Sequence, residues 1–391
     1  MATRLVVNRI GETAMKKSLT IIIAFFLLLS FIPHALTNGA GLIFIRADGS
    51  IDPSSAPIIR DGNTYSLTAD LYGTTIMVEK DNITIDGNGH LLLGSSTPYS
   101  TAVNISEREG VTVKNLKITS YYYGISIEFS RYNTLIGNTI SDNNIVIYAE
   151  GSTDNLIFHN NFVTEPNRKY GGANSWDNGI EGNYWSGDQN EDFYSGRFQN
   201  ITGSDGIGDY WYTVDEDNLD SYPLMGPYYS FSVEKQGNTQ YLYAISNSNI
   251  TSFTYNDTDR TIKFNVSPIS SVSGFCRICI PHALIEGNYT ITVNNQPPSQ
   301  NYMLFDNGTH RWQYFSYENP GRVIITPLRR STDINGDGLI DILDVAIVAK
   351  AYGSKPGDPK WYEKADLDTN GIINILDICI VAHDFGKKKI G

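Results

Sequence analysis

Short apolar segments recur at a regular interval through the first half of the chain. Between residues 81 and 163, aliphatic or β-branched residues follow Asn82 and precede Asn115, Asn138 and Asn160, in repeats of about 22 to 28 residues. A repeat of this length, with short strands separated by Gly and Asn turns, is typical of a solenoid coil. Asn tolerates the left-handed backbone of tight turns, and stacked Asn amides can hydrogen-bond to one another. The pattern therefore predicts a parallel β-helix.

The interior of this solenoid is predicted from the alternation of side chains along each strand. Successive residues of a strand point to opposite faces, so the apolar members of each coil are expected to face inward. Residues 37–80 are expected to form an N-terminal cap. The expected inward residues are Ile83, Ile85, Val111, Val113, Leu116, Ile118, Ile125, Ile127, Leu135, Ile136, Ile140, Ile145, Ile147 and Leu156.

The apolar pattern changes between residues 228 and 327. Longer segments there alternate apolar and polar residues, as in 241–245 and 261–266. This alternation predicts strands with one buried face, and the Asn and Gly turns between them indicate a β-sandwich. We therefore expect an immunoglobulin-like spacer, followed by a short linker over 326–332.

The most specific signal lies near the C-terminus, where residues 333–344 and 366–377 repeat one oxygen-rich pattern 33 positions apart. A calcium ion takes about six to eight oxygen ligands, and a 12-residue loop supplies them from positions 1, 3, 5, 7, 9 and 12. Gly338 and Gly371 stand at position 6, where the loop turns sharply. The predicted ligands of two calcium ions are Asp333, Asn335, Asp337, Leu339, Asp341 and Asp344 in the first loop, and Asp366, Asp368, Asn370, Ile372, Asn374 and Asp377 in the second.

Both loops end at position 12 in Asp, not in the bidentate Glu of the usual EF-hand. With this feature and the duplication, residues 331–388 resemble a type I dockerin module. The resemblance implies a small α-helical, double EF-hand-like fold with two calcium ions, which docks onto a cohesin domain through positions 10, 11, 17 and 18 of a repeat. The implied contact residues are Ile342, Leu343, Ala349, Lys350, Ile375, Leu376, Ala382 and His383. The alternative is that the apolar members of this set form the core of the module.

The repeat body resembles a right-handed parallel β-helix of the pectin-lyase-like superfamily, in the short-repeat, NosD-like form of archaeal secreted proteins. The resemblance rests on the Asn-containing repeats and on residues 183–186, 205–209 and 222–224, which are similar to the segments that close such helices. It implies contact with polysaccharide or the cell envelope. Copper binding is not implied, because no cluster of Cys, Met or His accompanies the repeats.

Two functions stay open for the β-helix. Tyr121, Tyr122, Tyr123 and Tyr148 could form an aromatic platform for sugar rings. The alternative is a polysaccharide lyase or O-glycosyl hydrolase carried by the dockerin, although the charged residues of the repeats form no recognisable catalytic set. These charged residues are Asp86, His90, Lys114, Glu128, Arg131 and Glu150.

Composition narrows the function classes. The chain of 391 residues is 41% hydrophobic and 12% aromatic, which is enough for several folded domains. Its formal net charge of −13 argues against binding to nucleic acid or anionic membranes, which needs clustered Lys and Arg. Part of the acidity lies between Asp188 and Asp217, and we consider a further calcium ion near Asp205 to Asp217.

A secretion signal is expected at the N-terminus. Lys16 and Lys17 precede a 14-residue apolar run, 19–32, which is short for a membrane span and typical of a signal peptide. We expect a secreted, cell-surface protein, with an uncleaved signal anchor as the alternative and Met15 as a second candidate start. Eight Asn-x-Ser/Thr sequons are the candidate glycosylation sites: Asn82, Asn104, Asn200, Asn249, Asn256, Asn265, Asn288 and Asn307.

These observations predict a mainly β chain of four segments. A signal peptide is expected over 1–40, a parallel β-helix with caps over 41–227, a β-sandwich spacer over 228–327 and a dockerin-like calcium module over 328–391. The leading hypothesis is a secreted or cell-surface modular protein. Its C-terminal module docks onto a cohesin-type partner in a calcium-dependent manner, and its β-helix contacts polysaccharide or the cell envelope.

Overall fold

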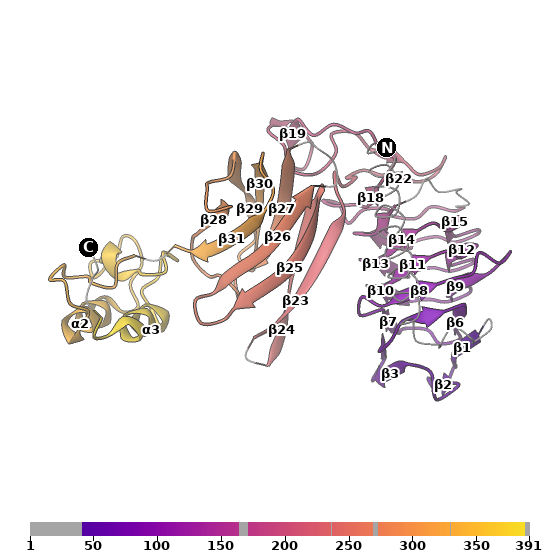
Figure 1. Cartoon of the computed structure of the whole chain (residues 1–391), viewed down its shortest axis with the longest axis horizontal. Helices are drawn as coiled ribbons and strands as arrows, with labels where there is room; N and C mark the ends of the chain where they lie inside the picture. The colour runs from indigo at the N-terminus through magenta and orange to yellow at the C-terminus, as the bar shows by residue number, and fades with distance from the viewer. Residues whose placement is uncertain (1–40, 164–170, 236, 269–272, 329, 388–391) are drawn as a thin grey trace, which may run out of the picture.

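The computed structural model describes residues 41–163, 171–235, 237–268, 273–328 and 330–387. A β-helix comes first, a β-sandwich lies in the middle, and a pair of short helices forms the C-terminal module (Figure 1). The predicted mainly β architecture, with a parallel β-helix and two short C-terminal helices, is therefore confirmed. The predicted signal segment lies outside the described residues. None of the helices in the described part is both long and apolar enough to span a membrane.

The β-helix consists of three six-stranded sheets, which stack the coils side by side. Strands of successive coils pair in parallel, and antiparallel pairs occur only at the N-terminal end. The first sheet contains β1 (Gly41–Ile45), β2 (Ile51–Asp52), β6 (Thr74–Val78), β9 (Thr101–Asn104), β12 (Tyr123–Ser126) and β15 (Ile145–Tyr148). The second contains β3 (Ile58–Asp61), β4 (Thr64–Leu67), β7 (Thr84–Asp86), β10 (Thr112–Lys114), β13 (Thr134–Ile136) and β16 (Leu156–Phe158). The third contains β5 (Leu71–Tyr72), β8 (Leu91–Leu93), β11 (Lys117–Thr119), β14 (Thr139–Ser141), β17 (Asn161–Phe162) and β18 (Tyr184–Trp185).

The register of the second sheet stacks one aliphatic residue per coil inside the helix. Ile85, Val113, Leu135 and Ile157 are direct cross-strand neighbours, and each is fully buried. Twelve of the fourteen expected inward residues are buried in this way. Ile136 and Leu156 are exceptions, because they point outward and are only half-buried. The expectation was wrong for these two because adjacent residues of a strand cannot both face inward.

Buried asparagines close the turns between the sheets. The Asn138 side-chain oxygen accepts from the Leu116 amide (3.1 Å), and its amide nitrogen donates to the Val113 carbonyl (2.9 Å) and to the Asn160 side chain (3.0 Å). Asn160 makes the same bond to Asn183 (3.0 Å). A second stack runs along the other edge of the second sheet through Asn133, Asn155 and Asn174. The next coil covers the backbone amides and carbonyls of these turns, and the asparagine side chains give them hydrogen-bond partners in place of water.

A cap and a β-sandwich follow the last coil. The cap holds two small hairpins, β19 (Tyr194–Ser195) with β20 (Ile201–Thr202) and β21 (Tyr212–Thr213) with β22 (Leu219–Asp220). One antiparallel sheet of the sandwich contains β23 (Tyr228–Lys235), β24 (Asn238–Ser246), β27 (Gly274–Pro281), β29 (Gln300–Asp306) and β30 (His310–Tyr317). The other contains β25 (Ser248–Asn256), β26 (Thr261–Pro268), β28 (Tyr289–Val293) and β31 (Arg322–Pro327). Residues of both sheets share one apolar core.

A buried ionic cluster fixes the sandwich onto the β-helix. Glu181 is fully buried and accepts from Arg277 (2.7 Å), His159 (2.8 Å) and the Tyr243 hydroxyl (2.8 Å). Burial by itself raises the pKa of Glu181, but the Arg277 charge and the His159 and Tyr243 contacts outweigh it and lower this pKa to about 2. Because a buried charge is costly without its partners, this cluster ties the two units in one arrangement.

The C-terminal module has a small core of its own. It contains α2 (Ile342–Ala351), the 3-10 turn η1 (Glu363–Ala365) and α3 (Ile375–Asp384). Its buried residues include Ile340, Val348, Leu367, Ile373 and Val381. With so few buried apolar residues, the module depends on additional contacts for its stability.

We predict that Asn138→Leu lowers the stability of the β-helix by about 2 kcal/mol or more, because it leaves the buried Leu116 amide and Val113 carbonyl without partners. Thermal denaturation of the whole chain measures the effect. Asn144→Leu is the matched control, since Asn144 is exposed in a neighbouring turn. Equal melting temperatures for the two variants would show that the asparagine stack is not needed for stability.

Candidate functional site

The first calcium loop is arranged by its own carboxylates. Asp333 accepts hydrogen bonds from the amides of Gly336 (2.8 Å) and Gly338 (3.1 Å). The buried Asp344, at position 12, accepts from the amides of Ile334 (2.7 Å) and Asp341 (3.0 Å). The two ends of the loop are therefore joined through one carboxylate, which also lies in the first turn of α2.

The second loop repeats this arrangement. Asp377 is buried and accepts from the amides of Leu367 (2.7 Å) and Asn374 (2.7 Å), and Asp366 accepts from the Gly371 amide (3.1 Å). Asn374 caps α3 through the Leu376 amide (2.8 Å), as Asp341 caps α2 in the first repeat. The same local sequence thus folds in the same way twice.

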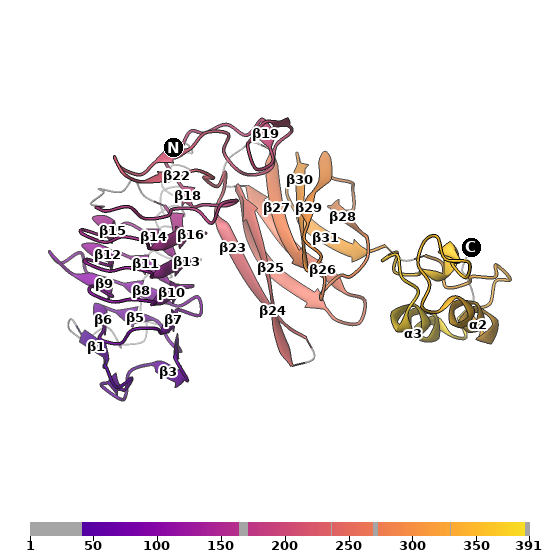
Figure 2. The same ribbon diagram turned by 180° about the vertical axis from the view of Figure 1, so that it is seen from behind.

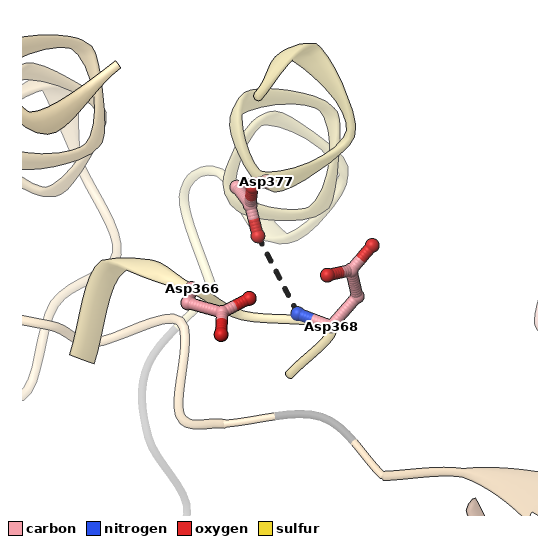
Figure 3. Close-up of side chains that lie close together, drawn as sticks. All are labelled: Asp366, Asp368 and Asp377. Carbon is pink, nitrogen blue, oxygen red and sulfur yellow. Dashed lines mark hydrogen bonds between the residues drawn. The ribbon is translucent and has the colours of Figure 1, made fainter. Parts of the chain in front are cut away.

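Three carboxylates converge in the second loop. Asp366, Asp368 and Asp377 each offer an oxygen atom, and these atoms lie within 4.8 Å of one another (Figure 3). Burial, and then the neighbouring Asp377 charge, raise the pKa of Asp368 to about 7. A divalent cation would relieve this repulsion, and hard carboxylate and carbonyl oxygens are the donors that calcium prefers. The donor set fits the predicted ion.

The predicted docking residues lie on the surface of the module. Ile342 is 64% exposed, Leu343 56% and Ile375 56%, whereas Leu376 is half-buried. Lys350 and His383 are exposed near the ends of the two helices. The alternative that these apolar residues form the core does not hold for the three exposed ones, because other residues fill it.

The second loop also contacts the β-sandwich. A Cβ atom on Gly287 would stand 1.7 Å from the Asp368 carbonyl oxygen, so only glycine fits at this approach. The Asn288 amide donates to the Thr369 hydroxyl (3.3 Å), and the Arg330 amide donates to the Leu367 carbonyl (2.9 Å). The second repeat therefore lies next to the sandwich.

Four tyrosines gather on the outer side of the first sheet and the adjoining loop. Ring centroids are 5.3 Å apart for Tyr99 and Tyr122, 4.7 Å for Tyr122 and Tyr123, and 5.0 Å for Tyr123 and Tyr148. Tyr121 is not part of this tyrosine cluster, because it is buried and donates to the Thr74 carbonyl (2.8 Å). The sequence analysis missed Tyr99, which is 75% exposed and lies in a loop outside the repeat pattern.

The charged residues of the coils that were weighed for catalysis are mostly in local contacts. The contacts join Asp86 to Lys114 (3.0 Å), His90 to Asp70 (3.1 Å), Arg131 to Glu109 (2.8 Å) and Glu150 to the Tyr148 hydroxyl (2.5 Å). These are pairs within one coil or between neighbouring coils. The structure does not bring them together into one group.

The acidic segment between residues 188 and 217 uses its carboxylates to close turns. Asp192 accepts from the amides of Asp205 (2.8 Å) and Gly206 (2.9 Å), and Asp209 accepts from the Phe193 amide (2.8 Å). Burial raises the pKa of Asp192 to about 7. Within the described ranges, the carboxylates of the second calcium loop are the one group whose ligand atoms converge, so this segment does not present a comparable set.

Seven of the eight sequon asparagines are exposed. Asn104 is the half-buried one, because it lies inside the first sheet and accepts from the Ser106 amide (2.9 Å). Asn288 is the sequon whose backbone touches the second calcium loop.

Comparison with known families finds a match for the β-helix and another for the C-terminal module. The family described as periplasmic copper-binding protein (NosD) matches residues 43–189, which span the strands of the β-helix. The dockerin type I domain matches residues 331–385, which span both calcium loops and both helices. No curated protein and no solved structure matches the chain.

These matches agree with the geometry of the two units. Dockerin type I domains bind calcium and dock onto cohesin partners, and the convergent carboxylates of the second loop are compatible with that ion. The description of the NosD family names a periplasmic, copper-binding protein. Residues 43–189 are therefore similar to the NosD family, and residues 331–385 are similar to dockerin type I domains, which bind calcium.

Proposed function

We propose that this chain is a secreted or cell-surface modular protein, which its C-terminal module attaches to a cohesin-type partner in a calcium-dependent manner. The observation that carries the proposal is the pair of equivalent loop-helix units, each with an apolar pair at the start of its helix. Ile342 and Leu343 are exposed in α2, and Ile375 is exposed beside the half-buried Leu376 in α3. Apolar groups that stay exposed among residues 41–163, 171–235, 237–268, 273–328 and 330–387 favour a partner surface.

Calcium would act through the residues that begin the helices. Asp344 and Asp377 belong both to the ligand sets and to the first turns of α2 and α3. The second loop brings Asp366, Asp368 and Asp377 close together, and this repulsion opposes folding when no cation is present. A bound ion supplies the opposite charge, and the loop residues then hold both helices in the orientation that presents the docking residues.

The tyrosine cluster favours a second function, contact with polysaccharide. Tyr99, Tyr122, Tyr123 and Tyr148 present neighbouring rings on one side of the β-helix. Flat aromatic faces bind the apolar faces of sugar rings, while nearby polar groups bind sugar hydroxyls. Glu150, bonded to the Tyr148 hydroxyl, is one such group. A polysaccharide lyase or glycoside hydrolase is the alternative, and release of unsaturated products or reducing ends from the bound polymer would reveal it.

We predict that the chain binds two calcium ions, that Asp366→Ala removes one, and that Asp333→Ala together with Asp366→Ala removes both. Each substitution deletes the carboxylate at position 1 of a loop. Isothermal titration of the full chain with calcium gives the stoichiometry. Asp358→Ala is the control, because Asp358 is exposed between the loops. Unchanged stoichiometry in the double variant would contradict the ligand assignment.

Docking is expected to be redundant between the repeats. Replacing Ile342 and Leu343 by Ser, or Ile375 and Leu376 by Ser, should leave binding to a panel of type I cohesin domains largely intact, because the other repeat presents an equivalent face. All four replacements together should weaken binding more than about 30-fold, the loss expected for central interface residues.

Two controls accompany the docking experiment. Calcium stoichiometry should stay at that of the unchanged chain in every variant, and Leu328→Ser, at an exposed apolar position before residues 331–385, should bind normally. If the fourfold variant loses calcium binding as well as docking, then Ile342, Leu343, Ile375 and Leu376 are needed for folding and not specifically for docking. Undiminished docking by the fourfold variant would exclude this surface.

For the tyrosine cluster, we expect Tyr123→Ala to weaken retention in polysaccharide gels about two- to tenfold, as for the loss of one stacked aromatic contact. Tyr132→Ala is the control, since Tyr132 is 60% exposed on the β-helix but outside the cluster. If the two variants are retained equally in every gel that retards the unchanged chain, the tyrosine cluster does not contact the glycan.

A further inference from the structure

A cleft separates the β-helix from the β-sandwich on the side away from the tyrosine cluster. Its volume is about 670 Å³, within the range of roughly 300 to 1,000 Å³ typical of ligand sites. One wall consists of coil turns that follow β7, β10 and β13, and the other consists of β23 and β24. Figures 1 and 2 show these two strands beside the second sheet of the β-helix.

The β-helix wall is a stack of turns, of which the two after β10 and β13 are equivalent in length and the one after β7, residues 87–90, is longer. Asn115 donates to Asp86 of the preceding coil (3.0 Å), and Gly137 follows in the next coil, where a Cβ would stand 3.1 Å from the Asn115 side-chain oxygen. Neighbouring coils are about 4.8 Å apart, which is close to the length of one pyranose ring. The wall therefore repeats along its length in steps that suit a chain of sugar units.

The sandwich wall offers hydroxyl groups and an aromatic ring. Ser230, Ser232 and Thr239 line the cleft, together with Tyr241, which is 54% exposed. β23 is the edge strand of its sheet, so part of its backbone has no strand partner. Groups that both donate and accept hydrogen bonds, next to a flat ring, are the elements of carbohydrate recognition.

The closed end of the cleft fixes its shape. The Asn161 side chain donates to the Tyr228 carbonyl (2.9 Å) and accepts from the Tyr228 amide (2.7 Å). The buried contact between Glu181 and Arg277 holds the same two units together. Because the cleft has its shape before a ligand binds, little free energy is needed to order side chains and loops on binding.

The charges of the cleft select the ligand class. Asp86 is paired with Lys114 (3.0 Å), and the other charged lining residues are Lys117 and Glu234, which accepts from the Thr239 hydroxyl. This balance provides no cationic surface for phosphate or uronate groups, and the many hydroxyls and amides do not suit lipid.

We propose that this cleft binds a neutral glycan chain along the stacked turns. The choice of ligand class rests on the proposed polysaccharide contact, but the site is separate from the tyrosine cluster, which lies on the first sheet. Rings would stack on Tyr241, and their hydroxyls would bond to the serines of β23 and the amides of Asn88 and Asn115.

Calorimetric titration of the full chain with short neutral oligosaccharides of glucan, mannan and xylan tests the proposal, with oligogalacturonate as the acidic counterpart. Tyr241→Ala should weaken binding of a neutral oligosaccharide about two- to tenfold. Ser232→Trp should abolish it by filling the cleft. Tyr132→Ala, the exposed control outside the cleft, should bind as the unchanged chain does, and Tyr123→Ala reports separately on the tyrosine cluster.

The outcomes separate this proposal from the broader one. Binding that Tyr123→Ala weakens and Tyr241→Ala leaves unchanged would overturn the cleft and support the tyrosine cluster. Tighter binding of oligogalacturonate than of every neutral oligosaccharide would overturn the assigned ligand class. No binding of any oligosaccharide, with cohesin docking intact, would overturn the cleft and leave the docking function standing. If Ser232→Trp has a lower melting temperature than the unchanged chain, the binding measured for Tyr241→Ala tests the cleft, because Tyr241 is exposed.

Discussion

The β-helix depends on amide groups that are buried between its coils. Its strands are two to five residues long, so much of the backbone lies in turns that the next coil covers. A covered amide or carbonyl without a partner costs about 1 to 3 kcal/mol, and each coil contains several. Asn138 and Asn160 meet this need with an oxygen that accepts and a nitrogen that donates in the same turn. Because three successive coils use the same solution at this turn, with Asn138, Asn160 and Asn183, they stack in register, and their outer surfaces also repeat.

This repetition sets what the surfaces of the β-helix can do. Side chains at equivalent places in successive coils lie next to one another, as Tyr123 and Tyr148 do on the first sheet. The turns that line the cleft are stacked in the same way. A ligand that itself repeats, such as a polysaccharide, can use such a surface over several units.

The two ends of the sandwich are attached by different physical means. Toward the β-helix, the fully buried Glu181 contacts Arg277 and His159, and this fixes the position of the sandwich. Separating these partners would leave a buried charge without its counter-charge. Toward the calcium module, the contact is made by backbone groups around Gly287 and the second loop. The first attachment is made by protein side chains, whereas the second touches a loop whose carboxylates are the predicted calcium ligands. We therefore expect calcium to affect the position of the module more than that of the β-helix.

The sequence alone determined the features that depend on local spacing. The calcium loops were evident because their ligands lie within 12 residues of one another, and the β-helix was evident because its coils repeat. Tertiary structure decided the features that depend on distant residues or on one position of register. Glu181 and Arg277 are 96 positions apart and neither belongs to a motif. Tyr121 is buried against the Thr74 carbonyl, and Tyr99 joins the cluster by contact with Tyr122, which lies 23 positions further along the chain. Likewise Leu135 is buried and Ile136 is not, because neighbouring residues in a strand face opposite sides and only packing chooses between them.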